Sequence, residues 1–155
     1  MLRGADEHNN SGGRYHSIGN SILSNCTYDV YVDCNIPNGA NDKGVFTGCK
    51  SKKVVINEGV TTIGDCAFAG SACQNVAIAE SVTTICDKAF YKCTALEDIV
   101  IPDGVASLGK YAFAETRTLK NITIGKGVTS VGREHFLIAS RCKASISPTL
   151  RPGAQ

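Results

Sequence analysis

Hydrophobic and polar positions follow the same order four times between residues 54 and 136. Each copy opens with two apolar residues separated by one position, passes through a turn into a Val-x-x-(Ile, Leu or Val) segment, and ends on Phe. The copies are VVINEGVTTIGDCAF, VAIAESVTTICDKAF, IVIPDGVASLGKYAF and ITIGKGVTSVGREHF, and their closing phenylalanines, Phe68, Phe90, Phe113 and Phe136, are 22, 23 and 23 residues apart. A fixed period of this length predicts a solenoid, in which each copy is one coil that buries its apolar side against its neighbours.

The opening segment of each copy has the period of a β-strand. Because successive side chains of a strand point to opposite faces, the apolar pairs should point inward and the residues between them outward. The inward pairs are Val54/Ile56, Val76/Ile78, Ile99/Ile101 and Ile122/Ile124, and the outward residues are Val55, Ala77, Val100 and Thr123. Coils stacked in register would form a parallel sheet along one side of the solenoid.

The remainder of each copy predicts corners and a second, shorter strand. The Val-x-x-Ile type of segment has apolar residues at i and i+3, which is typical of a short bent strand with its hydroxyl groups in solvent. The segment that closes each copy on Phe is expected to form a single helical or 3₁₀ turn. The phenylalanines would then stack as a column in the core, where each buried ring contributes about 1.5–3 kcal/mol.

The two ends of the chain depart from this pattern. Residues 1–25 are polar and rich in Gly, Ser and Asn, and are expected to form a flexible arm. Residues 26–148 are predicted to form one solenoid domain, with regular coils from about 46 to 136 and degenerate coils at both ends. Residues 149–155 are expected to be a loose tail.

Composition narrows the range of partners. The formal net charge is +2 and the basic residues are scattered, while aromatic residues make up 6% and Trp is absent, so no nucleic-acid partner is expected. No apolar run is long enough to cross a bilayer, so no membrane insertion is expected. The N-terminus lacks the apolar core of a secretory signal peptide, which leaves a cytoplasmic location open.

The chain contains eight cysteines, none of them in a CxxC pair: Cys26, Cys34, Cys49, Cys66, Cys73, Cys86, Cys93 and Cys142. Without a His at ligand spacing beside them, no metal site is predicted. Cys49 and Cys93 hold the same position two coils apart, about 10 Å, which is beyond disulfide reach. The cysteines are therefore interpreted as free, buried thiols of Val-like size, although Cys26 and Cys34, outside the regular copies, could bridge.

No pattern predicts an enzyme or a cofactor. No Cys or Ser has a His and a carboxylate at a recurrent position, and no glycine-rich phosphate loop precedes a helix. Of the three histidines, His8 and His16 lie in the arm, and His135 lies in the last, irregular copy. We expect no catalytic, cofactor-binding or metal-binding residues.

The copies resemble the BspA-like leucine-rich repeat family, also called the Treponema pallidum type, whose pattern is roughly LxxIxIPxxVTxIGxxAFxxCxxL. Residues 89–113, AFYKCTALEDIVIPDGVASLGKYAF, match best; Leu96 and Leu119 hold the leading Leu, and Cys49 and Cys93 hold the Cys. The resemblance covers about residues 45–146. It implies a mainly β, right-handed leucine-rich-repeat solenoid that binds proteins, in a family whose members are often adhesion proteins, secreted or at the cell surface. A host or extracellular-matrix protein is the implied kind of partner.

A protein-binding solenoid would use the outward rows of its strand face. The candidate binding residues are Lys53, Val55, Asn57, Asn75, Ala77, Asp98, Val100, Asn121 and Thr123. This face is expected to be flat and lightly charged, which suits a protein partner better than a small molecule. Two alternatives remain: the positions are only tolerated surface residues, or the chain is a spacer or self-associating fragment of a larger array, joined through the strand edges at the solenoid ends.

Overall fold

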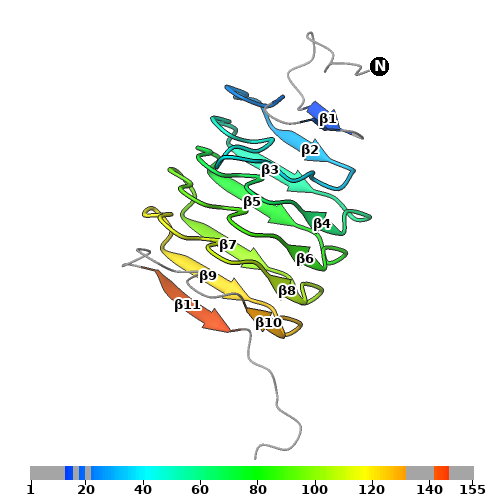
Figure 1. Ribbon diagram of the computed structural model, residues 1–155, viewed down its shortest axis with the longest axis vertical. Helices are drawn as coiled ribbons and strands as arrows, with labels where there is room; N and C mark the ends of the chain where they lie inside the picture. The colour runs from blue at the N-terminus through cyan, green and yellow to red at the C-terminus, as the bar shows by residue number, and fades with distance from the viewer. Residues whose placement is uncertain (1–12, 16–17, 20–21, 132–141, 147–155) are drawn as a thin grey trace, which may run out of the picture.

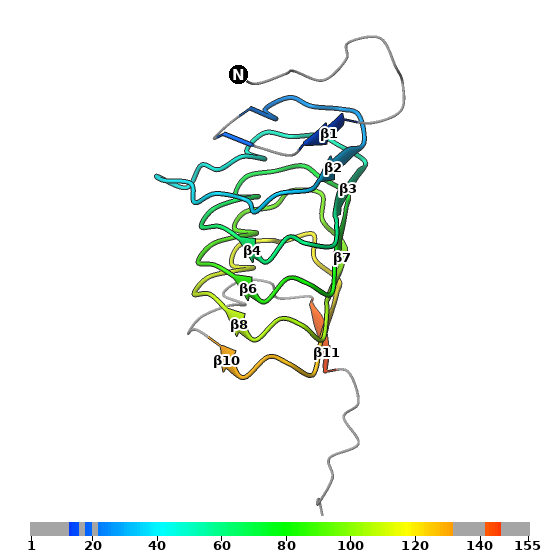
Figure 2. The same cartoon turned by 90° about the vertical axis from the view of Figure 1, so that its right-hand side faces the viewer.

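The computed structural model describes residues 13–15, 18–19, 22–131 and 142–146. The chain winds into a stack of similar coils along the long axis of the molecule (Figure 1). Each regular coil contributes a four-residue strand to one column and a two-residue strand to a second column, and the two columns lie on different sides of the stack (Figure 2). The predicted parallel β-solenoid is confirmed.

Every strand pair within the two columns is parallel. The first column consists of β2 (Val30–Val32), β3 (Lys53–Ile56), β5 (Asn75–Ile78), β7 (Asp98–Ile101), β9 (Asn121–Ile124) and β11 (Lys143–Ile146). The second consists of β4 (Thr62–Ile63), β6 (Thr84–Ile85), β8 (Ser107–Leu108) and β10 (Ser130–Val131). Equivalent residues of successive copies face each other, as Val54 faces Val76 and Ile99 faces Ile122, so the sequence period is the register of the sheet.

The folded part of the chain reaches into the stretch expected to be a flexible arm. Strand β1 (Gly13–Tyr15) pairs with β2, placing Gly13 opposite Val30. The apolar side chains of Ile18 and Leu23 belong to the same buried cluster as Val30. The polar composition of the first 25 residues concealed these few apolar positions, which extend the core beyond the first coil. His8, His16 and the expected tail at 149–155 lie outside the described residues.

The phenylalanines form the predicted column. Phe46, Phe68, Phe90 and Phe113 are fully buried, and their ring centroids are 4.1, 4.9 and 5.1 Å apart along the stack. Phe46, from the degenerate first coil, heads the column, whereas Phe136 lies outside the described residues.

The segment that closes each coil is a pair of turns, where a single helical or 3₁₀ turn was expected. The N–H of Ala67 donates to Gly64 at 3.2 Å and the N–H of Ala69 donates to Cys66 at 2.9 Å, both with the i→i+3 spacing of a 3₁₀ turn. Cys66 has φ of +55°, a left-handed conformation that interrupts any helix. The N–H of Phe68 instead donates to the carbonyl of Ala89 in the next coil at 2.7 Å, so hydrogen bonds between coils replace those of a helix.

Side-chain oxygens also join the coils at the corner before each Phe. The Oδ1 atoms of Asn38, Asp65 and Asp87 accept hydrogen bonds from the backbone N–H one coil later, at 2.9 Å from Asp65, 3.0 Å from Asp87 and 2.7 Å from Lys110. A lysine side chain has no acceptor atom, so this ladder ends at Lys110.

Replacing Phe90 by Ala should lower the free energy of unfolding by about 3–5 kcal/mol, because the substitution opens a cavity between two stacked rings. Urea denaturation measures the change. Phe90→Leu retains most of the buried volume and should lose clearly less. A loss below about 1 kcal/mol for Phe90→Ala would contradict a close-packed column.

Replacing Asp87 by Ala should cost about 0.5–1.5 kcal/mol, because the N–H of Lys110 loses its acceptor. Asp87→Asn is the matched control, since it keeps an Oδ1 acceptor and should remain close to the wild type. Equal losses for the two variants in the same urea experiment would show that the carboxylate charge matters, and not the hydrogen bond.

Candidate functional site

The predicted binding residues lie on the outward side of the first strand column. Seven of them line one open groove of about 680 Å³: Lys53, Asn75, Ala77, Asp98, Val100, Asn121 and Thr123. Val55 lies in β3, as Lys53 does, and Asn57 directly follows β3. Neither Val55 nor Asn57 lines the groove. The face is therefore hollowed at β5 and β7, whereas a flat surface was expected.

Five further residues line the groove and are not among the nine candidate binding residues: Val76, Ile78, Glu80, Ile99 and Pro102. Val76 and Ile99 belong to the inward set, yet they keep 7% and 3% of their surface exposed. These two inward residues line the groove at the place where the strand sheet is interrupted, between β5 and β7.

The interruption lies between β5 and β7. Strands β1, β2, β3 and β5 form one sheet and β7, β9 and β11 form another, whereas β4, β6, β8 and β10 form a continuous sheet on the other side. Within the described residues, β5 and β7 are thus neighbouring coils without a β-ladder between them. No ladder hydrogen bonds join their facing edges, although the two strands lie side by side.

The length of the coil changes at the same place. Phe46, Phe68 and Phe90 are 22 residues apart, and Phe113 follows Phe90 by 23. The additional residue lies in the connection that leads into β7. Three positions before the first inward residue of the strand, β5 has Cys73 and β7 has the larger Leu96, and both side chains are buried. The longer connection and the larger side chain coincide with the interruption. Pro102 contributes to it, because proline has no N–H at the position where Ala79 and Gly125 each donate to the preceding coil.

The groove is polar at its rim and apolar at its centre. Val100 is 61% exposed, the largest fraction among the exposed large hydrophobic residues. Asp98 accepts a hydrogen bond from the side-chain amide of Asn121, and the Oε2 of Glu80 accepts one from Gly104 N–H at 3.3 Å. An exposed aliphatic side chain among a few partly engaged polar groups is typical of a protein-binding surface.

The cysteines of the described residues are free thiols, and five of them are buried. All eight are free, so the possible bridge between Cys26 and Cys34 is not formed. Burial raises the pKa of Cys93 to about 12, and its thiol donates a hydrogen bond to the carbonyl of Phe68 at 3.2 Å. A thiol that is protonated at neutral pH is a poor nucleophile. Over the part of the chain that the structure describes, no group of three His, Cys, Asp or Glu residues could hold a metal ion.

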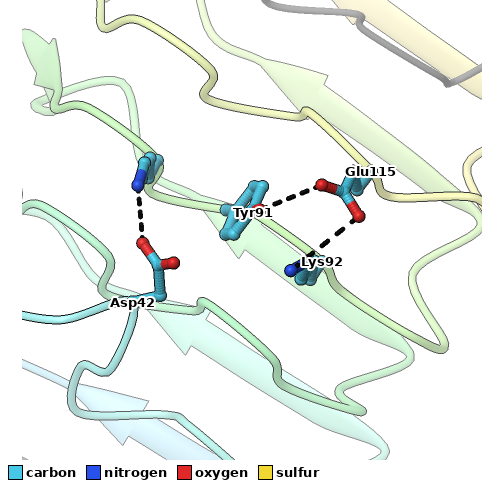
Figure 3. Close-up of polar contacts among 5 residues, drawn as sticks. Asp42, Tyr91, Lys92 and Glu115 are labelled. Carbon is cyan, nitrogen blue, oxygen red and sulfur yellow. Dashed lines mark hydrogen bonds and ion pairs between the residues drawn. The ribbon is translucent and has the colours of Figure 1, made fainter.

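A second polar cluster lies on the turns that close the coils (Figure 3). The Nζ of Lys88 is 2.6 Å from Asp42, and this hydrogen bond raises the pKa of Lys88. Tyr91 donates to Glu115 at 3.0 Å, and the Nζ of Lys92 lies 3.9 Å from Glu115 and 4.8 Å from the centre of the Tyr91 ring. Because each lysine of this cluster lies beside a carboxylate from another coil, the cluster joins neighbouring coils and presents little net charge to an external ligand.

The described residues contain no helix that could span a membrane. No curated protein matches the chain. Two solved structures are similar to it. A leucine-rich repeat protein from Eubacterium ventriosum has a TM-score of 0.63 and 29% identity, over 77% of this chain and 32% of that chain. The leucine-rich repeat protein of T. pallidum has a TM-score of 0.62 and 22% identity, over 74% and 56% respectively, and shows the fold alone.

The chain spans about a third and just over half of the lengths of these two proteins. The family model described as the BspA type leucine-rich repeat region matches residues 16–143 with six copies. The match includes the coils at both ends that the sequence pattern marks as degenerate. The chain belongs to the BspA-type leucine-rich repeat family.

Proposed function

We propose that the protein is a non-catalytic binding module that recognises another protein with the groove between β5 and β7. Leucine-rich repeat solenoids are generally protein-interaction modules. The observation that carries the proposal is the coincidence of three features at one place: the interrupted sheet, the hollow of about 680 Å³, and seven of the nine residues that the outward pattern predicts.

The shape of the site favours a protruding segment of the partner. An apolar side chain of that segment would pack against Val100 and Ala77, both exposed in the groove. Its polar groups would bond the rim residues Lys53 and Asp98. Such a contact has an apolar centre and a polar rim, which is the common anatomy of a protein interface.

We further propose that the protein binds its partner in adhesion at the cell surface. The family is typically surface-associated, and a host or extracellular-matrix protein is the partner that this setting provides. The proposal requires no cofactor, because binding through a sheet face uses only side chains and backbone groups of the chain itself.

A structural role is the second candidate. The chain matches 32% and 56% of the two similar solved proteins, so it has the size of a segment within a longer array. In the described part of the chain, β11 is the end strand of its sheet. One edge of β11 pairs with β9, and self-association would use the other edge. Light scattering distinguishes this role from the first: a strict monomer at high protein concentration would remove the support for self-association.

Val100→Arg should lower the affinity for the partner at least tenfold, because a long charged side chain fills the centre of the groove. Immobilised protein would capture its partner from a solubilised extracellular-matrix extract, and the captured protein would then be titrated against each variant by surface plasmon resonance. The matched control is Val131→Arg, since Val131 on β10 is similarly exposed, at 56%, on the other sheet.

Asp98→Lys should weaken the same interaction, because it reverses the charge at the rim. Unchanged binding by both groove variants, or an equal loss in Val131→Arg, would refute the groove as the binding site. Circular dichroism of each variant separates lost binding from lost folding.

A further inference from the structure

Three cysteines from successive coils lie in a row in the N-terminal half of the core. Cys26, Cys49 and Cys73 precede β2, β3 and β5. The thiol of Cys49 donates to the carbonyl of Cys26 at 3.7 Å, and the thiol of Cys73 donates to the carbonyl of Cys49 at 3.9 Å. Cys49 therefore has a cysteine neighbour in the coil on either side.

Backbone hydrogen bonds hold these cysteines one coil apart. The N–H of Lys50 donates to Cys26 and the N–H of Ala72 donates to Cys49, both at 2.7 Å. Neighbouring parallel strands are about 4.8 Å apart, and a disulfide needs Cα atoms about 4.4–6.8 Å apart. Neighbouring cysteines of the row are therefore within disulfide range, whereas Cys49 and Cys93 are two coils apart and are not.

We propose that Cys26 and Cys49 are a latent disulfide pair that can staple the first coil of the solenoid to the second. Cys26 is favoured over Cys73 as the partner of Cys49 by its place in the fold. Cys26 lies in the first coil and keeps 6% of its surface exposed, whereas Cys73 is fully buried. The end of a repeat stack opens more readily than its middle, so an oxidant reaches Cys26 first.

The oxidant required is a small disulfide such as oxidised glutathione. The Cys26 sulfur attacks one sulfur of glutathione disulfide, whose S–S bond breaks and releases the first glutathione. The Cys49 sulfur then attacks Cys26 in the mixed disulfide and releases the second. The two protein thiols lose two electrons and two protons, and glutathione disulfide gains them to become two thiols.

The environment of the pair makes this reaction slow near neutral pH. The hydrogen bond with Cys49 and burial raise the pKa of Cys26. For Cys49, the hydrogen bond with Cys26 lowers the pKa, but the hydrogen bond with Cys73 and burial outweigh it and raise the value to about 11. Because the thiolate is the attacking form, the rate should increase with pH up to these raised pKa values.

The test treats the folded chain of 155 residues with oxidised glutathione at pH 8.5, followed by N-ethylmaleimide and peptide mapping without reductant. Trypsin cleaves after Arg14, Lys43, Lys50, Lys53 and Lys88, so Cys26 lies in peptide 15–43, Cys49 in 44–50 and Cys73 in 54–88. The expected product is peptide 15–43 linked to 44–50. Because the bond constrains the unfolded chain, the oxidised protein should also melt roughly 5–10 °C higher, reversibly on reduction.

Peptide 15–43 also contains Cys34, so variants complete the assignment. The link should be absent in Cys26→Ser and should persist in Cys34→Ser and Cys73→Ser. The proposal is overturned if peptide 44–50 is found linked to 54–88, if the link persists in Cys26→Ser, or if only glutathione adducts form. It is also overturned if the folded protein retains all eight thiols after prolonged oxidation. Mapping of the wild-type protein decides between these products even where a serine variant fails to fold.

Discussion

The structure depends on the requirement that each coil find its hydrogen bonds and its apolar contacts in the next coil. The N–H of Phe68 bonds the carbonyl of Ala89, and the N–H of Phe90 bonds the carbonyl of Ala112 at 2.8 Å. The rings beside these bonds stack at 4.9 Å. A single coil is too short to satisfy its own backbone or bury its own Phe, so the coils stabilise one another or not at all. This dependence between neighbours explains why the period of the sequence is also the register of the sheets.

The interruption between β5 and β7 shows how much variation this architecture tolerates. The second sheet continues past it from β6 to β8, and Phe90 stacks on Phe113 at 5.1 Å just as Phe68 stacks on Phe90. Two of the three connections between these coils thus remain when the strand ladder is lost. The solenoid can therefore lose one strand ladder while the opposite face and the ring column hold the stack together.

The regular features of the fold were predictable from the sequence, because they depend on positions that recur. Val54 and Val76 pair because both are the first inward residue of their copies. The groove was only half predictable. Alternation identifies Val100 as outward, but the loss of the β5–β7 ladder is a property of the tertiary structure. The cysteine row was hidden for a related reason: Leu23 stands where the later coils have Phe, so counting from Phe does not align Cys26 with Cys49.

The division between inward and outward positions also explains how such a scaffold can carry different binding functions. The inward residues are under strong constraint, because Phe90 and Ile101 are fully buried and touch neighbouring coils. Val100, one position before Ile101, has most of its surface in solvent and contributes little to the stack. Substitutions at outward positions therefore alter the outer strand face at small cost in stability, whereas those at inward positions damage several coils. A face that is free to vary, on a core that is not, is what selection for new protein partners requires.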